Sequence, residues 1–250
     1  MLQRFRVCAI LQPTFLPWLG WFDIFDQVDA LVLLDDVPFS KQSWQQRNRI
    51  KTERGLEYLT LPVKTSGLSG QLIKDCEITG FDYSRKLIAS LRANYSKSPF
   101  FKQYIDEVIS VFNTCATTGK LVDINYELIK WMANKLKIET PVILASKLNV
   151  AGKRGEHVAK ICQKLGVDRY LSPAGAEGYL LEDASAFEQR GISVLIHGYD
   201  HPKYPQRFPP FLPYASALDL IFNVGPAARD IMESGRLYSK EIIAHAKIIR

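Results

Sequence analysis

Short, mostly apolar runs recur along this chain and are separated by segments with helical spacing. The runs that we interpret as strands cover residues 7–11, 30–34, 141–145, 169–172 and 192–196. Nearly continuous apolar runs of this length are typical of parallel strands that are buried on both faces. Between them, residues 18–28, 156–165 and 184–189 repeat apolar positions as amphipathic helices do. Strands that alternate with helices in this way predict an α/β protein with a mostly parallel open sheet and flanking helices.

The middle of the chain has a different pattern, which predicts an inserted helical block. A loosely alternating stretch at residues 56–63 predicts a strand, and a polar Gly-containing loop follows it. Residues 83–95, 100–113 and 121–137 then repeat apolar positions with helical spacing. We therefore expect a single α/β domain over residues 1–250, with a helical insertion or cap at about residues 83–138.

The last quarter of the chain combines a rigid loop with further helix. Residues 199–213 are rich in proline and aromatic side chains, which predicts a loop with little conformational freedom. A helix is expected to begin at Leu218 and to end near Gly225. We expect helical turns from there to the C-terminus, a stretch that includes His245.

Charge narrows the classes of ligand. The chain has 32 basic and 26 acidic residues, a net charge of +6 and a pI near 9.0, but its charges are scattered. The densest basic patch contains Arg47, Arg49, Lys51 and Arg54, separated by polar residues. This patch suits one anionic small molecule better than a long phosphate track, which argues against a nucleic-acid partner.

The cysteines and the apolar segments bear on cellular location. Cys8, Cys76, Cys115 and Cys162 are far apart, and no Cys-x-x-Cys pair occurs, so neither a metal finger nor a disulfide framework is indicated. We expect reduced, buried thiols. The apolar run at residues 7–11 is too short for a signal-peptide core, and no stretch approaches the roughly 18 apolar residues of a membrane span. These features favour a cytoplasmic protein.

The end of the first predicted strand carries a candidate anion site. Gln12 and Pro13 follow the strand, and Gly20 lies on the next helix. Backbone N–H groups in a strand-to-helix turn can bind a nucleotide phosphate. Neither Gly-x-Gly-x-x-Gly nor Gly-x-x-x-x-Gly-Lys-Ser/Thr is present, so two strong nucleotide signatures are missing. The alternative is that the prolines shape the turn and the neighbouring aromatic side chains pack.

Asp35 and Asp36 end the second predicted strand. Adjacent residues on a strand point to opposite faces, so only one of them can face a given pocket. Asp36 is our candidate general base, and Asp35 is a candidate substrate contact. A magnesium ligand, a turn cap or an ion pair with Arg47 or Arg49 are the alternatives.

A polar segment with one tryptophan follows. The residues that share this segment are Lys41, Trp44, Arg47, Asn48 and Lys51. If the segment is helical, their spacing forms a polar stripe in which an aromatic platform lies among cations. Guanidinium groups bind phosphate or carboxylate, and a tryptophan face stacks on bases or sugars. A solvated helix face is the alternative.

Further candidates lie near the ends of later strands. Ser172 has no Gly-x-Ser-x-Gly context, so a phosphate or sugar contact, together with Gly175 and Tyr179, is a better interpretation than nucleophilic catalysis. His201, in the proline-rich loop with Gln206, is a candidate general acid or base. No metal motif is present, and no cofactor is assigned.

Several of these segments together resemble the WbqC-like protein family. The segments that carry the resemblance are residues 9–22, 35–39, 44–51, 170–175, 179–180, 201–206 and 216–225. They occur in collinear order over almost the whole chain. The resemblance implies a bacterial protein from surface-polysaccharide (O-antigen type) biosynthesis that acts on a nucleotide-linked sugar. It supplies no catalytic residues.

Together, the residues and the resemblance favour a group transferase that moves an acyl or aminoacyl group onto a nucleotide-linked amino sugar. In this hypothesis Asp36 or His201 accepts the amine proton, and the remaining candidates bind substrate or phosphate. One alternative is a nucleotide-dependent activating enzyme, such as a nucleotidylyltransferase, although the usual paired histidines are missing. The other is a non-catalytic binding protein of the same pathway.

Overall fold

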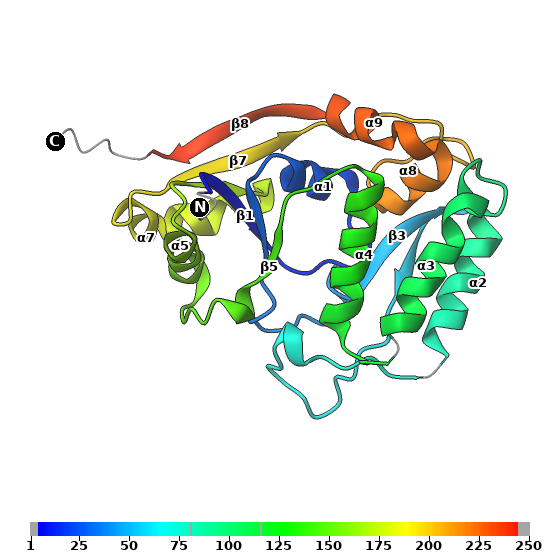
Figure 1. Ribbon diagram of the computed structural model, residues 1–250, viewed down its shortest axis with the longest axis horizontal. Coiled ribbons are helices and arrows are strands. Elements are labelled where there is room, and N and C mark those ends of the chain that lie inside the picture. The colour runs from blue at the N-terminus through cyan, green and yellow to red at the C-terminus, as the bar shows by residue number, and fades with distance from the viewer. Residues whose placement is uncertain (1–4, 81, 116, 245–250) are drawn as a thin grey trace.

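The computed structural model describes residues 5–80, 82–115 and 117–244, and a six-stranded sheet dominates this part of the chain (Figure 1). The strands, in sheet order, are β5 (Val142–Leu144), β2 (Ala30–Leu33), β1 (Val7–Leu11), β6 (Arg169–Ser172), β7 (Ser193–Tyr199) and β8 (Arg236–Ile243). The first five run parallel, and β8 runs antiparallel to β7. The predicted mostly parallel open sheet with flanking helices is confirmed.

Helices cover both faces of this sheet. They are α1 (Leu19–Asp26), α5 (Arg154–Leu165), α6 (Glu177–Glu182), α7 (Ala184–Glu188), α8 (Ala217–Val224) and α9 (Ala228–Ser234). Side chains alternate along β1, so Leu11 packs into a core with Phe22 of α1, whereas Ile10 packs into a second core with Val158 of α5. Both faces are therefore apolar, which explains why the parallel strands appear as continuous apolar runs.

The chain reverses its direction of travel across the sheet between β1 and β6. From β1 it passes through α1 to β2 on one side, and from β5 it returns through α5 to β6 on the other side. The α1 and α5 connections lie on opposite faces. In open α/β sheets, ligands bind at the carboxyl ends of the strands next to such a reversal. The loops after β1 and β6 are therefore the first place to look for a site.

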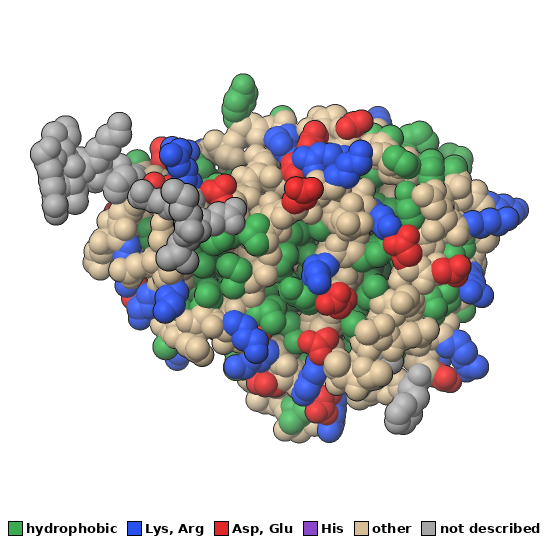
Figure 2. Space-filling view, in the orientation of Figure 1, with side chains coloured by type: hydrophobic (Ala, Val, Ile, Leu, Met, Phe, Trp, Pro, Cys, Tyr) green, Lys and Arg blue, Asp and Glu red, His purple; other side chains and the backbone are tan. Residues whose placement is uncertain are grey.

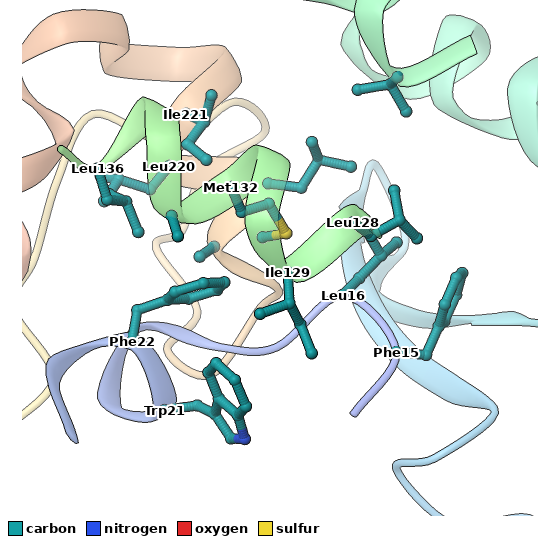
Figure 3. Packing of buried hydrophobic residues seen from close by; sticks show 14 of the residues in the cluster. Phe15, Leu16, Trp21, Phe22, Leu128, Ile129, Met132, Leu136, Leu220 and Ile221 are labelled. Atoms are coloured by element: carbon teal, nitrogen blue, oxygen red, sulfur yellow. The ribbon is translucent and has the colours of Figure 1, made fainter. Parts of the chain in front are cut away.

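The predicted helical block is present as α2 (Tyr83–Tyr95), α3 (Phe101–Cys115) and α4 (Leu121–Lys135). These helices share the core of α1 and α8. Figure 3 shows Ile129 and Met132 of α4 close to Phe22 of α1, with Ile221 of α8 beside them. Short 3₁₀ turns complete the set, at η1 (Ile73–Asp75), η2 (Ala145–Lys147), η3 (Ala174–Ala176) and η4 (Gly225–Ala227).

From the sequence, we considered a helix with a polar stripe for residues 41–51. These residues instead form a turn followed by a strand. β3 (Arg47–Thr52) pairs antiparallel with β4 (Gly55–Thr60) in a separate two-stranded sheet. Asn48 and Ile50 are buried, whereas Arg47 and Arg49 lie on the other face and are partly exposed. This period of two is that of a strand, so the helical interpretation of residues 41–51 was wrong.

The C-terminal region also differs from prediction. Helix α9 ends at Gly235, where the backbone of Asp200 approaches too closely for any side chain. Beyond it lies strand β8, where we had expected helix; residue 245 is outside the described residues. Arg236 anchors β8 to α1, because its guanidinium donates to Asp23 at 2.8 Å and to Asp26 at 2.7 Å.

A buried carboxylate connects the proline-rich loop to the core. Asp219 of α8 accepts hydrogen bonds from the Tyr95 hydroxyl (2.8 Å), the Tyr204 hydroxyl (2.7 Å) and the Gln206 amide (2.9 Å). Burial raises the pKa of Asp219, and these donors oppose that shift. Lys51 lies close enough to interact with the same carboxylate, and its ammonium donates to the Pro210 carbonyl at 2.8 Å. Three distant segments therefore meet at one buried carboxylate.

The surface carries mixed charges. On the face shown in Figure 2, Lys and Arg side chains are interspersed with Asp and Glu rather than gathered into a track. The four cysteines are buried and free. Within the described residues, no helix has the length and apolar character needed to cross a membrane.

Asp219→Ala should be strongly destabilising. It leaves the buried hydroxyls of Tyr95 and Tyr204 without their acceptor and the buried Lys51 ammonium without its counter-charge, so we expect the free energy of unfolding to fall by about 3–5 kcal/mol. Urea unfolding of the full chain measures this change. The exposed Glu53→Ala serves as control and should change stability by less than about 0.5 kcal/mol. Equal stability of the two variants would contradict the role given to Asp219.

Candidate functional site

Gln12 is a predicted site residue next to the chain reversal. It is exposed at the end of β1, and its side-chain oxygen accepts a 2.8 Å hydrogen bond from the Gln45 amide. Its backbone carbonyl accepts from the Thr14 hydroxyl at 3.2 Å. Pro13 is buried, and its carbonyl accepts from Asn125 of α4 at 3.0 Å. Gln12 is therefore held in place from two directions while remaining open to solvent.

The two aspartates at the end of β2 have different roles. Asp35 is buried, and its oxygens accept from the Ser146 backbone N–H at 2.8 Å and from the Ser146 hydroxyl at 2.6 Å. This carboxylate ties β2 to the turn η2 after β5. Asp36 lies on the opposite side of the chain, where it faces His157 of α5. Asp36 is thus the member of the pair that is free for chemistry.

Asp36 and His157 form a carboxyl–imidazole pair at this edge. The Asp36 Oδ2 to His157 Nε2 distance is 3.5 Å, the imidazole is buried and the carboxyl is largely enclosed. Within the described residues, Asp36 Oδ1 and His157 Nε2 are buried without hydrogen-bond partners. Burial raises the pKa of Asp36, whereas His157 and, more weakly, Lys74 lower it. A carboxyl with an elevated pKa and an unused lone pair is suited to accept a proton.

A second feature is an aromatic pocket of about 260 Å³. Its lining residues are Thr14, Trp18, Trp21, Trp44, Asn48, Arg49 and Tyr214. The rings of Trp18 and Tyr214 meet at 64°, with their centroids 5.4 Å apart. The Arg49 guanidinium lies 5.5 Å from the Trp44 ring. The pocket thus has flat apolar walls with one cation at its edge.

Backbone hydrogen bonds join the three segments that form this pocket. The Phe15 N–H donates to the Trp44 carbonyl at 2.9 Å, which fixes the loop after β1 against the start of β3. The Ser216 N–H donates to the Arg49 carbonyl at 2.8 Å, which fixes the loop before α8 against β3. These bonds are independent of side-chain identity, so the pocket walls are set by the backbone.

His201 lies behind the pocket rather than next to Asp36. Its ring stacks on Trp18 at a centroid distance of 6.1 Å and contacts Tyr214 edge-on at 5.3 Å. Nδ1 is 2.9 Å from the Pro202 carbonyl, which can only accept, so Nδ1 carries the proton. Burial lowers the pKa of His201, so the ring is neutral at pH 7. Its Nε2 is buried among aromatic rings, and the two candidate bases therefore occupy different places.

The remaining candidates of the 41–51 segment divide between surface and core. Lys41 is exposed in the turn, and Trp44 is 48% exposed at the pocket mouth. Arg47 lies over the Tyr58 ring at 4.3 Å. Asn48 lines the pocket, but its amide is already bound to the Phe15 carbonyl (3.0 Å) and its oxygen to a backbone N–H. Lys51 is only 2% exposed, and burial lowers its pKa.

The candidates after β6 and in the proline-rich loop range from buried to exposed. Ser172 is fully buried, whereas Gly175 is exposed in η3. Tyr179 is half-buried on α6, and burial raises the pKa of its hydroxyl. Gln206 uses both ends of its amide, which bind Asp219 and the backbone of Leu212. Among the described residues, no three His, Cys, Asp or Glu side chains are grouped to hold a metal.

Gly20 has a steric role at the pocket. A Cβ at this position would overlap the ring of Trp18, which lies directly over the first turn of α1. The glycine therefore allows Trp18 to form a pocket wall, and the contact between Gly20 and a phosphate stays a prediction.

Sequence reasoning missed several residues of the two features. They are Thr14, Trp18, Trp21, Tyr214 and His157, whereas Arg49 was predicted only as part of the basic patch that suits an anion. The signal in the sequence was the density of aromatic residues after the first strand, but the local pattern does not distinguish a pocket wall from core packing. The partner of Asp36 lies 121 residues away, and only the path of α5 across the sheet brings it close.

Comparison with known proteins agrees with the resemblance of the sequence segments. The family model described as the WbqC-like protein family matches residues 12–231. This chain belongs to the WbqC-like protein family. It is 32% identical over 225 residues to the uncharacterized protein Rv1507c of Mycobacterium tuberculosis. The aligned residues make up 90% of this chain and 96% of the relative. No solved structure matches this WbqC-like protein.

Gly20→Ala should destabilise this WbqC-like protein even though alanine favours helix. The added Cβ forces the Trp18 ring to move. We therefore expect the free energy of unfolding to fall by about 1–3 kcal/mol and the tryptophan emission spectrum to change. Chemical unfolding followed by fluorescence measures both. Gly178→Ala is the matched control, because α6 has open space at that position and the variant should be neutral or slightly stabilised. A neutral Gly20→Ala would show that Trp18 does not require this glycine.

Proposed function

We propose that this protein is a group transferase that moves an acyl or aminoacyl group onto the amine of a nucleotide-linked amino sugar. Bacterial surface-polysaccharide biosynthesis, in the cytoplasm, is the proposed setting. Membership of the WbqC-like family supports the proposed pathway and does not by itself assign a reaction. The observation that carries the proposal is the Asp36–His157 pair at the carboxyl ends of the parallel strands, next to the chain reversal.

The proposed step needs one base and no redox chemistry. The sugar amine attacks the carbonyl carbon of an activated ester or thioester, a new C–N bond forms, and the C–O or C–S bond to the leaving group breaks. Asp36 removes the amine proton, which passes to the leaving alcohol or thiol. His157 favours the charged form of the carboxylate, because it opposes the larger effect of burial, which raises the pKa of Asp36.

The first test is a direct transfer assay. Nucleotide-linked amino sugars are incubated with acyl thioesters and aminoacyl esters, and mass spectrometry detects the amide product. At least one pair should give product at a rate proportional to protein concentration. If no pair is converted while a nucleotide-linked amino sugar binds, the protein is a binding protein of the pathway and the transferase proposal is wrong.

Asp36→Asn should separate activity from stability. Loss of the base should lower turnover by about 10²–10⁴-fold. Because the pKa of Asp36 is raised, the stability it contributes is present below its unfolded pKa and is lost as pH rises through its folded pKa. At pH 8 the neutral Asn removes the cost of a buried charge, so the Tm should be equal to or above wild type. Asp230→Asn, at an exposed position on α9, is the control and should retain full turnover.

His157→Asn should move the pH profile in a defined direction. Turnover falls as pH falls through the pKa of Asp36, because only the carboxylate accepts a proton. Removing the imidazole leaves burial to raise that pKa without opposition from His157, so the acidic limb of kcat/KM should shift to higher pH. Thermal unfolding at each assay pH controls for loss of fold. An unshifted limb in a folded variant argues against the pairing.

A further inference from the structure

The aromatic pocket described above, with Trp44 and the Arg49 guanidinium in its lining, takes no part in the proposed proton transfer. It opens on the loop after β1, and Thr14 in its wall is hydrogen-bonded to Gln12 at the strand end. The neighbouring strand end carries Asp36. A ligand group seated in the pocket would therefore lie at the same edge of the sheet as the acid–base pair.

The shape of the pocket favours a flat ring. Rings from Trp18, Trp21, Trp44 and Tyr214 supply most of its wall, and its volume is about 260 Å³. Aromatic walls stack on the flat faces of nucleobases. Trp44 and Tyr214 are each 48% exposed, which is a large exposure for side chains of this size.

The polar groups of the pocket favour a base over a sugar. A sugar ring presents several hydroxyls that need hydrogen-bond partners. The amide of Asn48 is already bound to the Phe15 carbonyl, and the Thr14 hydroxyl donates to the Gln12 carbonyl. The pocket therefore offers flat faces and few free polar atoms.

Arg49 supplies an unmatched cation. Arg54, at the turn of the same hairpin, pairs with Glu57 at 2.8 Å. In the described part of the chain, Arg49 and Arg47 form no ion pair and instead lie against the rings of Trp44 and Tyr58. The Arg49 Nη2 donates to the Tyr214 carbonyl at 3.3 Å, which holds the guanidinium at the pocket, whereas its Nε is buried and has no hydrogen-bond partner in the described residues. A guanidinium in this state is suited to bind phosphate.

We propose that the pocket between Trp18, Trp44 and Tyr214 binds the base of a nucleoside diphosphate, with Arg49 on its phosphates. The assignment rests on the proposed function in one respect only, that the nucleotide is the carrier of the amino sugar. The stacking and the cation define the nucleotide half of the substrate, and Asp36 acts on the sugar half.

Tryptophan fluorescence tests this assignment without a transfer assay. Of the four tryptophans, three line the pocket, and the fourth, Trp131, lies on α4 with its ring N–H bound to Glu107. The full chain is titrated with the diphosphates of uridine, thymidine, cytidine, guanosine and adenosine. At least one should quench emission saturably, and the quenching should persist in Trp131→Phe.

Two substitutions separate the ring from the phosphate. Trp44→Ala should weaken binding of that nucleoside diphosphate about tenfold, measured by calorimetry, and Arg49→Gln should weaken it at least tenfold and flatten its salt dependence. Arg54→Gln, on the same hairpin, should bind as wild type. Trp44 is half-exposed, so its variant is expected to fold, and circular dichroism checks this.

Several results would overturn the assignment. They are wild-type binding by both Trp44→Ala and Arg49→Gln, pyrophosphate binding as tightly as the nucleotide, and quenching by free sugars with all nucleotides silent. Nucleotide binding that depends on Trp44 supports the pocket even if no transfer is detected. Transfer that depends on Asp36 but needs no nucleotide supports the proposed function and rejects the pocket assignment.

Discussion

The buried carboxylate of Asp219 is the interaction on which the arrangement of this protein most depends. A carboxylate enclosed in protein is tolerated only when donors surround it, and here they come from α2 and the proline-rich loop, with a lysine of β3 nearby. The hydroxyls of Tyr95 and Tyr204 would lose their acceptor without Asp219. The helical block, the hairpin and the loop are therefore stabilised as a set, and the loop that ends in Tyr214 takes one defined path over the hairpin.

Two different chemistries lie at one edge of the sheet. The chain reversal between β1 and β6 opens the strand ends, Asp36 meets His157 on one side, and the aromatic pocket forms on the other. The division corresponds to the needs of the proposed transferase, in which one part of the site would hold the carrier and another would accept a proton. The two neighbouring aspartates divide in a similar way. Asp35 joins the end of β2 to the turn after β5, whereas Asp36 faces His157.

The extent to which the sequence predicted this structure follows from how local each signal is. Strands buried on both faces appear as apolar runs, so β1, β2 and β7 were predicted from the local sequence pattern alone. β3 was misread because its buried polar residues have distant partners: Asn48 binds the Phe15 carbonyl, and Lys51 binds that of Pro210. β8 was misread because its pairing with β7 and its anchor on α1 lie far away in sequence. For the same reason Asp36 was predicted as a candidate, whereas His157 as its partner was not.

The pocket is assembled from segments that are far apart in the sequence, and this has a consequence for how the chain folds. Its walls come from residues 14–21, 44–49 and 214, and the last hydrogen bond between them joins Ser216 to Arg49. Contacts of such long sequence separation close slowly and late, since most of the loop entropy must be lost first. A chain emerging from the ribosome therefore has no pocket until nearly all of it has been made. Any molecule that fits this pocket would report on completed folding, and would protect the whole fold by mass action.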